Sequence, residues 1–221
     1  MRRLVIPGEL VSKENKKMGT GVACKDGEIH SNQLGLLDEK ENFVRVIPLS
    51  GGYNPKEIDF VIGVVSYVHN TFWKLDIASP YKSILPGGEF FRDLRGKERL
   101  RDILPIGSAV YVKIKEVTKS KGVFTTLKWR GATVLKGGFL IEISPSKVPR
   151  LIGKKDSMID ILRSESGCEI LVGQNGVIWI NGPVENMDLA IEAIRYIEAN
   201  SHKRGLTDYV KNMLIEKRKN L

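Results

Sequence analysis

The sequence predicts a multidomain chain that is mainly β at first and α+β in its last third. Three observations lead to this: turn-forming clusters divide the chain, β-branched and aromatic runs fill the first two blocks, and helical periodicity appears only in the third. The 221 residues suit one large domain or two to three small ones, and 42% hydrophobic residues can form a core.

Two breaks set the expected domain boundaries. The run PLSGGYNPKE, residues 48–57, combines two glycines with Asn54 and Pro55, and a second break is the Gly137-Gly138 pair after a basic strand. We therefore expect domains at residues 1–56, 57–136 and 137–221. Each is small, so mutual packing is needed for full stability.

The first block is expected to be a small meander of short β-strands. Its apolar runs, at residues 4–6, 21–23 and 43–47, are separated by Pro-Gly, Asp-Gly and a charged DEKEN turn. This predicts an N-terminal β domain.

The second block predicts five longer strands, at residues 61–68, 72–78, 81–85, 109–117 and 123–127. Residues 109–117 (AVYVKIKEV) alternate apolar and polar side chains, as a half-buried strand does. A five-stranded Greek-key barrel of the OB type closes so short an all-β block without exposed edges. The long loop at residues 86–105 carries interleaved arginines and acids, and long loops in compact domains are commonly functional.

The third block predicts strands and helices in the order β-α-α-β-β-α. A strand at 139–143 precedes short helices at 146–151 and 157–164; a hairpin of strands 169–172 and 177–180 turns at Gly173 to Gly176; an amphipathic helix covers 184–199. This order, with a basic loop between the first two helices, matches a type I K-homology (KH) domain. An extra C-terminal helix is expected from Thr207 to about Lys219.

Positive charge is concentrated in one stretch of the chain. The net charge is +9; residues 111–136 hold 7 basic groups against one acid, whereas residues 137–194 hold 5 basic and 8 acidic groups. A local basic excess is typical of a polyanion-binding surface. A solvated face that keeps the protein soluble explains it equally well.

We expect single-stranded RNA to contact the barrel and the KH loop. Aromatic side chains at the first strand connection can stack bases, although Phe72 and Trp73 alternate and one of them must point inward. The loop RLIGKKD has Asp156 where G-x-x-G loops have their second glycine, and a carboxylate there repels phosphate, so a KH unit used only for packing stays open. The predicted RNA-binding residues are Tyr67, His69, Phe72, Lys74, Arg92, Arg95, Lys97, Arg99, Lys119, Lys121, Arg150, Lys154 and Lys155.

Catalytic, cofactor and metal sites are not expected. The chain has no P-loop, G-x-S-x-G or H-E-x-x-H motif, and the scattered acids Asp76, Asp93 and Asp102 are more simply ion-pair partners than metal ligands. Its two cysteines, far apart, predict reduced thiols. We expect Trp129 and Trp179 in the core and the histidines His30 and His202 in surface or structural roles.

The start of the chain is charged and contains proline, without the apolar stretch of a signal peptide, and no apolar run is long enough for a membrane span. A cytoplasmic location is expected.

Six segments resemble the RNA-binding cap subunit of the archaeal exosome, KH type, the ribosomal-RNA-processing protein four family. The resemblance covers essentially the whole chain, and G-x-N-G is its most diagnostic motif. The segments are VIPGELV (5–11), GGYNPKEIDFVIGVV (51–65), FWKLDI (72–77), ILPIGSAVYVKIKEV (103–117), IGKK (152–155) and GQNGVIWING (173–182).

The resemblance implies a non-catalytic role. Three such subunits would form a trimeric cap on a hexameric ring of RNase PH-like subunits, docking through the N-terminal β domain, with S-one-type OB domains around the pore. The cap would capture RNA 3′ ends and feed them to phosphorolytic 3′-to-5′ exoribonuclease sites in the ring. It also implies that the G-x-N-G segment is structural, at the packing of the KH and OB domains.

Two other functions stay open. OB and KH domains also occur in ribosome-associated and translational RNA-binding factors, and a stand-alone nuclease would reveal itself by degrading RNA without partners. Co-purification distinguishes the exosome subunit from the ribosome-associated factor: nuclease subunits would accompany the first, and ribosomal particles the second.

Overall fold

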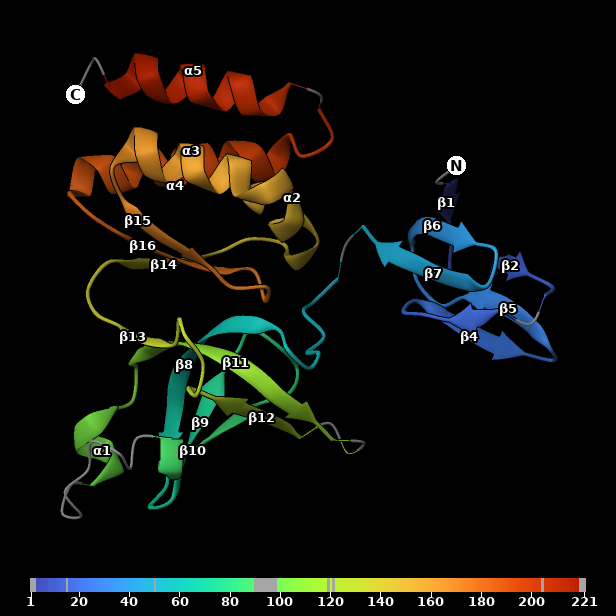
Figure 1. Cartoon of the computed structure of the whole chain (residues 1–221), viewed down its shortest axis with the longest axis horizontal. Coiled ribbons are helices and arrows are strands. Elements are labelled where there is room, and N and C mark those ends of the chain that lie inside the picture. The colour runs from blue at the N-terminus through green and yellow to red at the C-terminus, as the bar shows by residue number, and fades with distance from the viewer. Residues whose placement is uncertain are drawn as a thin grey trace. The chain divides into compact units, whose positions relative to one another are not determined.

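The computed structural model describes residues 3–14, 16–49, 51–89, 99–118, 120, 122–203 and 205–218. The chain divides into two compact units, Met1–Gly51 and Gly52–Leu221 (Figure 1). Each unit has its own core: aliphatic side chains fill the first, and the second contains a β-barrel and an α+β domain.

The first unit is built of two small sheets. One has the strand order β1-β6-β7-β3 and the other β2-β5-β4. The strands are β1 (Arg3–Val5), β2 (Leu10–Ser12), β3 (Lys17–Met18), β4 (Val22–Lys25), β5 (Glu28–Ser31), β6 (Gly35–Lys40) and β7 (Phe43–Pro48). The expected N-terminal β domain is confirmed, but the meander is wrong, because β1 pairs with β6 and β3 runs parallel to β7. The single buried residue of β1, Val5, joins Leu37 and Val46 in the core, which draws β1 to distant strands.

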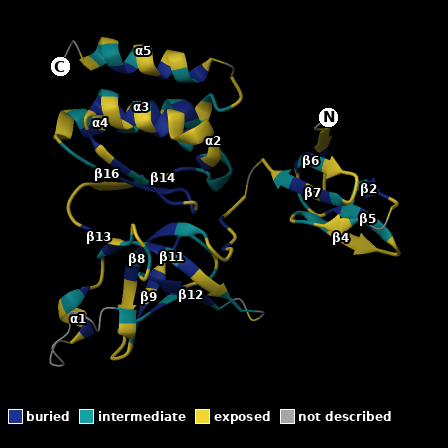
Figure 2. Cartoon of the chain, in the orientation of Figure 1, coloured by how far each residue is buried: buried dark blue, intermediate teal, exposed yellow. Residues whose placement is uncertain are grey.

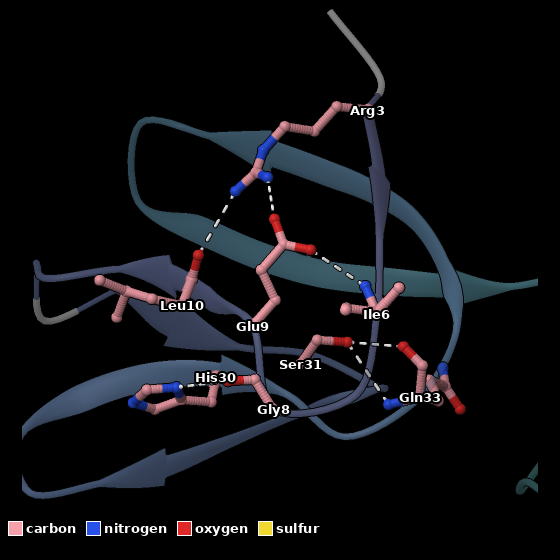
Figure 3. Close-up of polar contacts among 8 residues, drawn as sticks. All are labelled: Arg3, Ile6, Gly8, Glu9, Leu10, His30, Ser31 and Gln33. Carbon is pink, nitrogen blue, oxygen red and sulfur yellow. Dashed lines mark hydrogen bonds and ion pairs between the residues drawn. The ribbon is translucent and has the colours of Figure 1, made fainter.

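Polar contacts hold the chain where it leaves β1 and enters β2 (Figure 3). The Glu9 carboxylate accepts the Ile6 N–H at 3.0 Å and pairs with the Arg3 guanidinium. The hydrogen bond from Ile6, and after it the contact with Arg3, hold the pKa of Glu9 below its usual value. The Nδ1 atom of His30 lies 3.2 Å from the Gly8 carbonyl oxygen, which agrees with a structural role for this histidine.

The barrel of the second unit closes with five strands, as predicted for an OB-type fold. The strands are β8 (Phe60–Val68), β9 (Phe72–Asp76), β10 (Ser83–Pro86), β11 (Ala109–Val117) and β12 (Val123–Thr126). Antiparallel pairs run from β10 through β9 and β8 to β11; β12 then joins β11 and pairs in parallel with β10, which completes the ring. The short strand β13 (Thr133–Leu135) adds to β11, and the turns η1 (Gly87–Glu89) and α1 (Leu100–Ile103) lie in the long loop.

The KH domain has the predicted order β-α-α-β-β-α plus a last helix. Its sheet runs β14-β16-β15, and β16 is buried along nearly its whole length (Figure 2). The elements are β14 (Phe139–Glu142), η2 (Pro145–Lys147), α2 (Val148–Ile152), η3 (Lys154–Asp156), α3 (Ser157–Ser166), β15 (Glu169–Val172), β16 (Val177–Asn181), α4 (Val184–Ala199) and α5 (Leu206–Arg218). Helix α5 lies over α3 and α4 (Figure 1) and buries Leu206, Val210 and Leu214 in the same core.

The turn between β15 and β16 joins the KH domain to the barrel. Asn175, only 2% exposed, donates from Nδ2 to the carbonyls of Ile62 (2.8 Å) and Ile77 (3.0 Å), and its Oδ1 accepts the Ile62 N–H. Gln174 exchanges two 2.8 Å hydrogen bonds with the backbone of Phe60. Gly176 has φ +86°, and a Cβ there would lie 2.3 Å from the Ile143 carbonyl oxygen, so this turn needs glycine. The structural role implied for this motif is confirmed.

The two predicted core tryptophans differ. Trp179 is buried where the KH sheet meets the barrel, beside Ile62 and Leu135, a contact that we call the joint. Its indole donates to the Gly137 carbonyl at 2.8 Å. Trp129 is only half-buried: it follows the last barrel strand and covers the outside of the barrel, with its ring 4.4 Å from Phe60 and 5.4 Å from Tyr111. The core prediction was wrong for Trp129. Apolar neighbours in the sequence do not show whether a residue after the end of a strand packs inside or outside the barrel.

In the part of the chain that the structure describes, none of the helices is both long enough and apolar enough to cross a lipid bilayer.

Candidate nucleic-acid interface

Four of the predicted RNA-binding residues lie together on the β8–β9 hairpin. A bulge between Val65 and Tyr67 shifts the register so that Tyr67 lies opposite Lys74, whose Nζ is 5.4 Å from the center of the tyrosine ring. The His69 and Phe72 rings stack with centroids 4.6 Å apart. We call Tyr67, His69, Phe72 and Lys74 the hairpin face; its exposed tip is yellow in Figure 2.

The hairpin face is held in shape by its own turn and by the neighbouring segment. The His69 N–H donates to the Phe72 carbonyl at 2.8 Å, and the His69 Nδ1 lies 3.0 Å from the Thr71 hydroxyl. The Thr71 carbonyl accepts the Gly87 N–H at 2.8 Å. These bonds fix the turn and the His69 ring before any ligand arrives, which lowers the entropy cost of binding.

The alternation of Phe72 and Trp73 is resolved. Trp73 is fully buried in the barrel and its Nε1 donates to the Leu104 carbonyl at 3.1 Å. Phe72, one residue earlier, faces outward and is half-buried against His69. The inward ring supports the barrel, and the outward ring is available to a ligand.

Sequence reasoning missed one aromatic side chain beside this face. Lys74 lies opposite Ile84 in β10, and Ile84 lies opposite Phe124 in β12, so the three outward side chains form one row across the barrel. Phe124 is half-buried between the inward residues Val123 and Thr125. The alternation within residues 123–126 was the signal that could have found it.

The predicted loop cations are only partly within the described residues. Arg92, Arg95, Lys97, Lys119 and Lys121 lie outside them. Arg99 is exposed directly before α1.

The KH-loop residues belong to a separate domain from the hairpin face. Lys154 and Lys155 are exposed, whereas the Arg150 guanidinium donates to the Lys203 carbonyl at 2.8 Å and so ties α2 to the turn before α5. Asp156 adopts the left-handed conformation, φ +64°, despite its Cβ. Aspartate tolerates this region better than most residues, so the loop keeps a glycine-like backbone while presenting a carboxylate.

Comparisons with known proteins agree with this architecture. Residues 2–50 match the family model of the exosome RNA binding protein RRP4 N-terminal domain, and residues 138–186 match that of the KH domain. A crystal structure assigned to the exosome complex RNA-binding proteins superposes with a TM-score of 0.70 at 30% identity, over 77% of this chain and 99% of that one.

Curated relatives are similar over nearly the full chain. Exosome complex component Rrp4 of Methanothermus fervidus is 42% identical, over 97% of this chain and 96% of its own. The Rrp4 proteins of Methanobrevibacter smithii and Pyrococcus furiosus are each 41% identical, over 96% and 98% of this chain and 70% and 84% of their own. At this identity and coverage, the chain belongs to the Rrp4 family of exosome complex components.

Proposed function

We propose that this chain is a non-catalytic RNA-binding cap subunit of the archaeal exosome. It captures single-stranded RNA 3′ ends at the pore of a hexameric ring of RNase PH-like subunits, as one member of a trimeric cap. The ring then degrades the RNA by phosphorolysis. The observation that carries the proposal is the hairpin face, a preformed aromatic and basic surface on an OB-type barrel, in a chain of the Rrp4 family.

The chemistry of the hairpin face suits a strand of any sequence. Every base has a π face, so rings such as Tyr67 and Phe72 stack bases without reading them, at about 1–3 kcal/mol per base. Lys74 adds attraction for phosphate that weakens as salt rises. Stacking rings and a lysine hold a strand, and the proposal places cutting in the ring rather than on this face.

A surface of the N-terminal unit supports docking to other subunits. In the register of the first sheet, Leu4 lies opposite Leu36, and Leu36 opposite Ile47, on the side away from the buried Val5. Leu4 is 57% exposed, and the neighbouring Ile6 and Leu34 are 58% and 41% exposed. An antiparallel sheet normally turns polar residues to water, so this aliphatic face fits burial against another protein. We assign it to the nuclease ring and call these five residues the N-terminal apolar face.

The test is degradation of labelled single-stranded RNA by the reconstituted ring, with and without this chain. We expect the chain to lengthen the run of nucleotides removed per binding event, because tethering raises the local concentration of the strand at the pore. The chain alone, with phosphate and Mg²⁺, should leave the RNA intact. Equal processivity with and without the chain, or degradation by the chain alone, would contradict the proposal.

A further inference from the structure

Strand β14 has an open edge. It pairs only with β16 among the described strands, and the Ile143 N–H continues that pairing by donating to the Gly176 carbonyl. Because backbone groups alternate in an antiparallel ladder, Leu140 and Glu142 direct theirs away from β16. The Glu142 carbonyl accepts the Arg195 guanidinium at 2.7 Å, as this geometry requires. The Leu140 N–H and carbonyl and the Glu142 N–H remain on this edge, and an edge of this kind can pair with an added strand.

The side chains of the same two residues line a cavity. Leu140 and Glu142 face a space of about 300 Å³ between the KH sheet and the barrel. Ile62, Val64 and Asp76 line it from the barrel side. Figure 1 shows the KH sheet between its helices and the barrel, which places this space beside the joint. Leu140 is 39% exposed, so apolar surface continues from the cavity onto the strand. Phe139 alternates with Leu140 and lies on the other face of the sheet.

Two carboxylates, those of Asp76 and Glu142, line the cavity. The Asp76 carboxylate accepts the Ala78 N–H at 3.0 Å, and within the described residues neither Asp76 nor Glu142 forms a side-chain ion pair. Arg195, whose guanidinium reaches the Glu142 carbonyl, is held by the Glu198 carboxylate at 3.1 Å. Lys74, two residues before Asp76 in β9, lies against the Tyr67 ring. Residues 137–194 also carry a net charge of −3, in contrast to the basic remainder of the chain.

These features select a ligand class. Two carboxylates repel the phosphates of RNA, so the cavity is unsuited to the strand that the hairpin face attracts. Lysine and arginine combine an apolar stem with a cationic head, and therefore fit apolar walls that end in carboxylates. An extended segment with such a side chain can at the same time bond to the open backbone groups of a strand.

We propose that β14 and this cavity form a docking site for an extended, basic segment of a partner protein. The segment adds to the edge of β14 through backbone hydrogen bonds and places a lysine or arginine side chain against Asp76 and Glu142. The site is separate from the RNA-binding role of the hairpin face, and it gives the acidic KH block a protein ligand.

The test uses the full chain and two fluorescein-labelled hexapeptides, one alternating arginine and valine, the other glutamate and valine. Fluorescence anisotropy should show binding of the basic peptide only. The double variant Asp76→Asn/Glu142→Gln should weaken it by about fivefold for each carboxylate removed. The matched control is Glu169→Gln/Glu185→Gln, which removes two exposed carboxylates that do not line the cavity. It should bind like the unaltered chain.

Hydrogen exchange locates the bound peptide. The basic peptide should slow exchange of the amides of Leu140 and Glu142. Equal affinity of the two double variants, binding of the acidic peptide, or protection elsewhere without protection of β14 would overturn the proposal. Protection of β14 by single-stranded RNA, with no protection of β14 by the basic peptide, would instead assign the surface to nucleic acid.

Discussion

At the residue scale, the hairpin face shows how strand alternation sorts similar side chains into different roles. Phe72 and Trp73 are adjacent aromatic residues, and the period of two sends one outward and the other to a fully buried position. The sequence alone could predict that one ring is exposed. It could not predict which, because that depends on how the Trp73 indole reaches the Leu104 carbonyl 31 positions away.

The first prediction concerns the rings of this face. Phe72→Ala and Tyr67→Ala should each weaken binding of mixed-sequence single-stranded RNA by about 1–3 kcal/mol if the ring stacks one base. Fluorescence anisotropy at fixed salt measures this. Tyr209→Ala is the control, since Tyr209 is 52% exposed, close to the 48% of Tyr67, but lies on α5. Equal losses in all three variants would remove the hairpin face from the RNA site.

The second prediction separates the two cysteines by their surroundings. Cys24 is exposed, whereas Cys168 is buried, and burial raises the pKa of the Cys168 thiol. A raised pKa leaves less thiolate, the reactive form, at any given pH. Ellman's reagent at pH 8 should therefore modify one thiol rapidly in the folded chain and two after denaturation. Two equally fast thiols in the folded chain would contradict this.

At the element scale, strand and helix positions were largely predictable, and their partners were less so. The five barrel strands and the KH order follow from local periodicity, which a single segment carries in its own residues. The N-terminal strands are too short for this: β1 has one buried residue, and its pairing with β6 depends on a core assembled from distant positions. The prediction for Trp129 was wrong for the same reason, because Trp129 packs on Phe60, a residue far away in the sequence.

The third prediction tests the turn that joins the KH domain to the barrel. Asn175→Ala removes the partners of the Ile62 N–H and carbonyl and of the Ile77 carbonyl in a buried site. Each unsatisfied buried group costs about 1–3 kcal/mol, so the free energy of unfolding should fall by about 3 kcal/mol or more. Urea denaturation followed by tryptophan fluorescence measures the change.

A matched asparagine serves as its control. Asn200 donates from Nδ2 to the Tyr196 carbonyl at the end of α4, a single bond in a half-buried position. Asn200→Ala should cost about 1 kcal/mol. If the two variants lost the same stability, the Asn175 network would not be what holds the turn in place.

At the scale of the whole molecule, the two proposed tasks fall on different units. The hairpin face and the joint both belong to the second unit, so the proposed RNA surface is carried on a barrel braced by the KH domain. The N-terminal apolar face belongs to the first unit. Because the faces share no residues, substitutions in one should leave the function of the other nearly unchanged.

The last prediction uses this independence. Leu4→Ser/Ile6→Ser should abolish or strongly weaken co-elution of the chain with the nuclease ring, since burying one aliphatic side chain contributes about 1.5–3 kcal/mol. RNA binding by the isolated variant should be unchanged, because the hairpin face is intact. The control Met18→Ser/Ile58→Ser removes two side chains that are 47% and 66% exposed outside this face. Size-exclusion chromatography of each variant with the ring gives the result: unchanged co-elution of Leu4→Ser/Ile6→Ser would reject the docking face, while loss of RNA binding in the same variant would show that the two units do not act separately.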